Sequence, residues 1–60
     1  MTEVEYKRRT AKMTQSELAE KAGVNVGTIV SIEKGGIENA KVGTLMKLAA
    51  ALNCELKDLF

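Results

Sequence analysis

The chain has 60 residues, 45% of them hydrophobic, and a formal net charge of +1. A chain this short forms one domain, residues 1–60, too small for a deep substrate cavity, and no apolar run approaches the ~20 residues that span a bilayer. The chain has no histidine and one cysteine, so we expect no metal site, no disulfide and no enzyme activity. We also expect a cytoplasmic protein with no cofactor, no membrane contact and no small-molecule substrate.

Charge is unevenly distributed along the chain. Between Lys7 and Lys47 there are eight basic and four acidic residues, a net of +4, whereas the two ends together carry −3. A basic middle that gathers on one face attracts nucleic acid, but ordinary solvated charges give the same count. The distribution alone therefore leaves both interpretations open.

The first predicted helix begins at Thr2, whose hydroxyl can accept a hydrogen bond from the first turn. Residues at helical spacing form its inward stripe: Val4, Arg8 and Ala11. An arginine on an inward stripe is unusual, because buried charges need a partner.

Two short helices follow, joined by a tight turn. Thr14 and Glu17 form a capping-box pattern that predicts the start of the second helix, and Gly23 predicts its end. Asn25 is a good N-cap for the third helix, which Gly35 and Gly36 end. The apolar positions that lock the pair together are Leu18, Ala22, Val24, Ile29 and Ile32. This spacing is typical of a helix-turn-helix, which presents its second helix outward and can place it in the DNA major groove.

The remaining sequence predicts one long helix and a short closing turn. We expect residues 37–40 to form a surface loop and Asn53 to end the fourth helix. The apolar stripe of that helix is Val42, Leu45, Met46, Leu48, Ala49 and Leu52. The end of the chain, with Leu56, Leu59 and Phe60, is expected to fold back and close the core. No alternation typical of strands occurs.

The ordered set of these residues resembles the phage repressor and Cro-like helix-turn-helix family, often called the XRE family, from Val4 to Phe60. The residues that carry the resemblance are Arg8, Met13-Thr14-Gln15, Leu18-Ala19, Gly23-Val24, Thr28-Ile29, Ile32-Glu33, Gly35, Thr44-Leu45, Leu48-Ala49, Ala51-Leu52 and Asp58-Leu59. The resemblance implies an all-α, lambda repressor-like bundle of four to five helices. It also implies a transcriptional regulator, usually a repressor, that binds a two-fold symmetric double-stranded operator as a homodimer.

The resemblance also implies roles for individual residues. Gln15 would contact a backbone phosphate, and Lys34, Asn39 and Lys41 would lie near the phosphates. The residues expected to face the groove or its rim are Asn25, Val26, Gly27, Thr28 and Ser31. Arg8 would pair with Glu33 and tie the first helix to the end of the third.

The chain departs from the family pattern at the positions that read bases. Family members often carry Gln, Arg, Ser or Asn there, but this chain has Val26 and Gly27, with Val30 beside them. Valine can contact a thymine methyl, whereas glycine offers no side chain. An exposed apolar pair can also mark a protein contact. The alternative function is therefore a protein-interaction module of the same fold with weak or no DNA binding.

Overall fold

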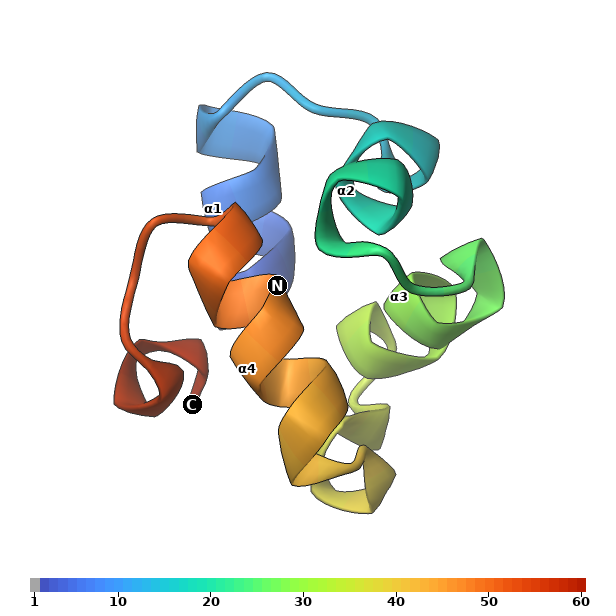
Figure 1. Ribbon diagram of the computed structural model, residues 1–60, viewed down its shortest axis with the longest axis vertical. Coiled ribbons are helices and arrows are strands. Elements are labelled where there is room, and N and C mark those ends of the chain that lie inside the picture. Colours follow the sequence, from blue (N-terminus) through green and yellow to red (C-terminus); the bar gives the residue numbers. More distant parts are fainter. Residues whose placement is uncertain (1) are drawn as a thin grey trace.

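The computed structural model describes residues 2–60, and this part of the chain contains four α-helices, two 3₁₀-helices and no strand (Figure 1). The elements are α1 (Glu3–Thr10), α2 (Gln15–Ala22), α3 (Val26–Glu33), η1 (Gly36–Asn39), α4 (Val42–Ala51) and η2 (Leu56–Leu59). The predicted all-α bundle is confirmed. No helix within residues 2–60 has the length and apolar character needed to cross a membrane.

The first three helices begin at the predicted caps. The Thr2 hydroxyl accepts from the Glu5 backbone amide at 3.1 Å, and the Asn25 side chain accepts from the Gly27 amide at 2.7 Å. At α2 the capping box is complete, because Thr14 and Glu17 each accept from the other's backbone amide. These bonds satisfy amides that have no partner inside the helix.

The turn between α2 and α3 fixes the angle at which α3 is presented. Gly23 adopts a left-handed conformation with φ of 72°, which glycine reaches without steric penalty. The predicted α2 stop at Gly23 is therefore confirmed. Only Val24 and Asn25 separate this glycine from α3, so the connection leaves little freedom between the two helices.

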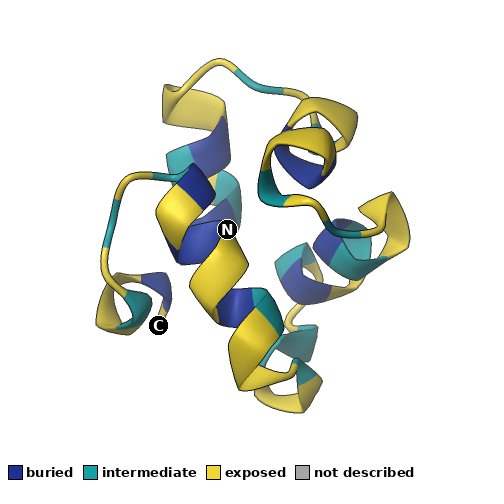
Figure 2. Cartoon of the chain, in the orientation of Figure 1, coloured by how far each residue is buried: buried dark blue, intermediate teal, exposed yellow. Residues whose placement is uncertain are grey.

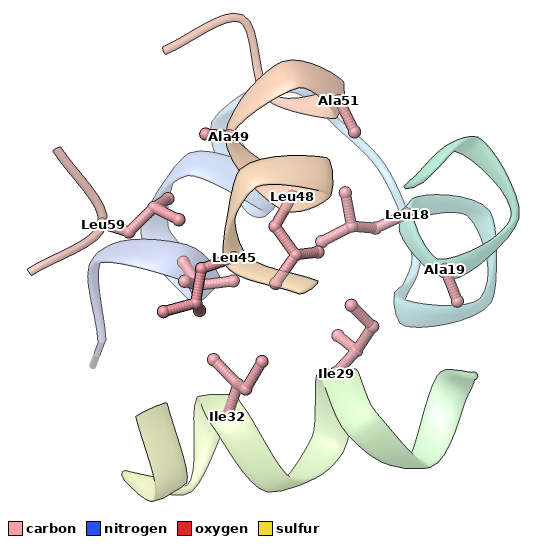
Figure 3. Close-up of a cluster of buried hydrophobic side chains, with 10 residues drawn as sticks. Leu18, Ala19, Ile29, Ile32, Leu45, Leu48, Ala49, Ala51 and Leu59 are labelled. Atoms are coloured by element: carbon pink, nitrogen blue, oxygen red, sulfur yellow. The ribbon is translucent and has the colours of Figure 1, made fainter. Parts of the chain in front are cut away.

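The core lies where α2, α3 and α4 meet, and Figure 3 shows their side chains pointing into one interior. The most deeply buried residues are Val4, Leu18, Ile29, Ile32, Leu48 and Leu59. α2 packs against both α3 and α4, and η2 packs against α4 and α1. Burying each of these side chains contributes about 1.5–3 kcal/mol relative to leaving it exposed.

Four residues predicted to face the core do not. Ala11 is exposed because α1 ends at Thr10. Met46 is 59% exposed, since it follows the buried Leu45 and a step of one residue turns a side chain by about 100°. Val42 and Phe60 are 62% and 65% exposed because they stand at element ends beyond the packed interior. Figure 2 shows buried and exposed residues alternating along α4.

The predicted surface loop at residues 37–40 was also wrong. Gly36–Asn39 form the 3₁₀-helix η1, and Ile37 and Ala40 are half-buried against the core. Gly35, with φ of 103°, turns the chain out of α3, and η1 then packs back against α3. The segment that precedes α4 is therefore anchored beside α3.

Candidate nucleic-acid interface

A buried polar cluster joins the helix-turn-helix to α1. Arg8 donates from Nε to Glu33 Oε2 at 2.6 Å and from Nη2 to Glu33 Oε1 at 3.1 Å. A third Arg8 nitrogen, Nη1, donates to the Met13 carbonyl at 2.8 Å. The side chains of Arg8 and Glu33 are only 10% and 5% exposed. The two residues predicted as an ion pair thus lie in bidentate contact, an arrangement with stronger geometric constraint than a single bond.

Gln15 belongs to the same cluster. Its Nε2 donates to Glu33 Oε1 at 3.0 Å, which connects the first residue of α2 to the last residue of α3. Sequence reasoning assigned Gln15 to a phosphate and missed this contact, because nothing local links residues 18 positions apart. Together with the turn at Gly23, this contact restricts the angle between α2 and α3.

The charges in this cluster stabilise each other. Burial acts to raise the pKa of Glu33, but hydrogen bonds from Arg8 and Gln15, together with the positive charges of Arg8 and Arg9, outweigh it and hold that pKa below its usual value. The hydrogen bond to Glu33 raises the pKa of Arg8 despite desolvation. The pair is therefore ionised at neutral pH.

The outward face of α3 carries few hydrogen-bonding side chains. Val26 is 42% exposed, and Gly27 and Ser31 are exposed as well. Thr28 and Val30 are half-buried, while the Asn25 oxygen is occupied by its capping bond to Gly27. The inward face carries Ile29 and Ile32, so the same helix has one core face and one free face (Figure 3).

A surface groove of about 350 Å³ lies between α3 and η1. Its lining consists of Asn25, Gly27, Thr28, Ser31, Ile32, Gly36, Asn39 and Ala40. Five of the residues predicted to bind DNA therefore meet in one place: Asn25, Gly27, Thr28, Ser31 and Asn39. The side-chain amides of Asn25 and Asn39 and the hydroxyls of Thr28 and Ser31 are neutral donors suited to phosphate contacts.

The other predicted contacts lie around this groove, except for Gln15. Val26 adjoins it at the start of α3, and the exposed Lys34 and Lys41 follow α3 and precede α4. Lys34 and Lys41 place positive charge at both ends of the segment that contains η1. Within residues 2–60, no three His, Cys, Asp or Glu residues gather closely enough to hold a metal ion.

Sequence reasoning missed Gly36, which it interpreted only as a helix stop. A Cβ built at Gly36 would lie 2.8 Å from the Ser31 carbonyl oxygen and 2.9 Å from the Ser31 hydroxyl. The carbonyl is held in place, because it accepts from the Lys34 amide at 3.2 Å. The missing side chain at Gly36 therefore allows η1 to approach α3 and sets the width of the groove.

We expect Gly36→Ala to weaken binding of a DNA duplex to the candidate interface while the core stays folded. The new methyl lies well inside the roughly 3.5 Å at which non-bonded atoms pack, so η1 must move away from Ser31. The control is Gly43→Ala, since a Cβ at Gly43 meets nothing within 4 Å. Duplex titrations below the melting temperature of each variant provide the measurement, and equal affinities for the two variants would contradict this role.

Comparison with known proteins places the chain in a family. Residues 4–59 match the helix-turn-helix family profile. An uncharacterized HTH-type transcriptional regulator of Archaeoglobus fulgidus is 46% identical over 48 residues, which cover 80% of this chain and 67% of that protein. Another regulator of the same description and organism is 37% identical over 59 residues, covering 98% of this chain and 82% of its own. The chain belongs to the XRE-type helix-turn-helix family of DNA-binding transcriptional regulators.

Proposed function

We propose that this domain represses transcription by binding an operator in double-stranded DNA with α3 in the major groove. The observation that carries the proposal is the arrangement of α3, whose free face and adjoining groove bring five predicted contact residues together. The family membership and the regulator relatives support a DNA partner. A domain that occupies an operator represses by excluding other proteins from that DNA.

Phosphate contacts should outweigh base contacts. Lys34 and Lys41 are exposed at the two ends of the η1 segment, where they can reach the backbone of one strand. Thr28 and Ser31 add hydroxyl donors on the groove side of α3. Gln15 has a second amide proton beyond the one it gives to Glu33, so it can serve a phosphate without leaving the cluster. Specificity then depends partly on DNA shape.

We further propose that two copies bind a two-fold symmetric operator. One domain of this size reads few base pairs, and helix-turn-helix dimers place their two reading helices about one DNA turn apart. The segment from Leu56 to Phe60 is the proposed self-contact, because the aromatic residue Phe60 is 65% exposed directly after η2. Burial of this ring against a second copy removes apolar surface from water.

Salt dependence tests the proposal. We expect wild-type affinity for a selected duplex to fall steeply as salt rises, with a log–log slope near −0.9 per phosphate contact. Lys34→Ala and Lys41→Ala should each weaken binding on all sequences and lower that slope by about one. Lys47→Ala, in α4 and outside the groove lining, is the control and should leave the slope unchanged.

The rival function is a protein-interaction module whose contact surface includes the exposed Val26. Apolar contacts are far less sensitive to salt than phosphate contacts are. A chain that binds no duplex at low salt would contradict the DNA proposal and favour this rival.

A further inference from the structure

We propose that Val26 reads the C5-methyl group of thymine in the major groove, so that the operator is recognised partly by a methyl group. The inference rests on the proposed DNA-binding function and adds the chemical feature that α3 selects. It follows from which groups on the outward face of α3 remain free after the internal contacts are assigned.

The polar side chains near the start of α3 are largely engaged within the protein. The Asn25 oxygen accepts from the Gly27 amide at 2.7 Å, and Gln15 donates to Glu33 at 3.0 Å. Gly27 has no side chain, so the hydrogen-bonding groups left on the α3 face are the hydroxyls of Ser31 and Thr28 and the NH₂ group of Asn25, none of which can form a bidentate contact in this arrangement. Recognition through several bidentate hydrogen bonds to bases is therefore not available to this helix.

Val26, by contrast, is not one of the hydrophobic residues that form the core or pack against it. The apolar staple of a helix start joins the residue before the N-cap to the fourth helical residue, and here those positions are Val24 and Ile29. Val24 packs against the core that contains Ile29. Val26 is the first residue of α3 and remains 42% exposed. Its two methyl groups are therefore available to contact a partner that binds at the start of α3.

The position and chemistry of Val26 fit one feature of DNA. In helix-turn-helix proteins the N-terminal residues of the second helix contact base edges. Thymine alone among the four bases displays a methyl group in the major groove, and apolar side chains contact it. Beside Val26, the bare backbone at Gly27 allows close approach to the bases. Burying one methyl group corresponds to about fourfold in affinity.

Thymine-to-uracil exchange provides the test, because it removes only the methyl group and keeps base pairing. A duplex selected from random sequence is resynthesised with deoxyuridine replacing each thymine in turn. We expect one or two exchanges per half-site to weaken wild-type binding about fourfold. Val26→Ala should bind the thymine and uracil versions equally well.

Val42→Ala is the matched control, because Val42 is also an exposed valine at the first position of a helix. That variant should keep the full difference between thymine and uracil. Equal wild-type affinity for all thymine and uracil duplexes would overturn the inference while leaving DNA binding established. Undiminished discrimination by folded Val26→Ala would overturn it too. Absence of binding to any duplex would instead refute the proposed function and this inference with it.

Discussion

Glu33→Ala is expected to remove a large part of the free energy of unfolding of the domain at 25 °C. The substitution removes both carboxylate contacts of Arg8. The buried guanidinium then keeps only one acceptor, the Met13 carbonyl. Breaking a buried ion pair in this way costs about 3–5 kcal/mol. The whole free energy of unfolding for a domain of this length is only roughly 3–9 kcal/mol. Urea denaturation followed by circular dichroism measures the loss.

Glu5→Ala is the matched control for this variant. Glu5 also pairs with an arginine, Arg9, at 2.8 Å, but the arginine side chain is 60% exposed. Exposed pairs one helical turn apart contribute about 0.3–0.5 kcal/mol. If Glu33→Ala destabilises the chain no more than Glu5→Ala, the buried cluster does not hold the helices together.

The same carboxylate makes stability depend on pH in a defined direction. Because hydrogen bonds lower the folded-state pKa of Glu33, its ionised form adds stability at any pH above the pKa that Glu33 has in the unfolded chain. That contribution disappears as the pH falls through the lower folded-state value, while Arg8 keeps its charge. Glu33→Gln has no charge to titrate, so its unfolding free energy should change less between neutral and acidic pH.

Leu48→Ala is the second variant for which we expect a large effect, about 2–5 kcal/mol of destabilisation. Leu48, in α4, is 0% exposed, and its side chain points into the core toward the side chains of α2 and α3 (Figure 3). Truncating it removes apolar contacts and leaves a cavity that rigid neighbouring helices cannot fill. Met46→Ala, on the same helix and 59% exposed, should change stability by less than about 0.5 kcal/mol. Equal losses for the two variants in denaturant titrations would contradict this core assignment.

The starts of α1, α2 and α3 and the end of α2 were predictable because their signals are local. The capping box joins Thr14 to Glu17, three residues away, and Gly23 ends α2 through its own backbone conformation. Helical spacing likewise predicted the buried residues Leu18 and Ile29. Spacing does not say where the bundle ends, however. Val42 therefore looked like a core residue, although it lies at an exposed helix start.

The candidate site was predictable in part, through its resemblance to a known family. That resemblance assigned Ser31 to the DNA groove or its rim and Asn39 to the neighbourhood of the phosphates, and both residues line the surface groove between α3 and η1. It did not reveal the bond between Gln15 and Glu33 or the close approach of Gly36 to Ser31. Both depend on how separate helices meet, which the pattern of one helix does not encode.

The most direct test of the central claim, that the outward face of α3 and the η1 groove bind DNA, is an NMR titration. The ¹⁵N-labelled chain is titrated with a selected duplex while backbone amide shifts are followed. The account predicts that the largest shifts lie in residues 26–31 and 36–41, with small shifts in residues 47–51 at the end of α4. Saturating duplex that leaves residues 26–31 unshifted, or that shifts residues 47–51 instead, would contradict it.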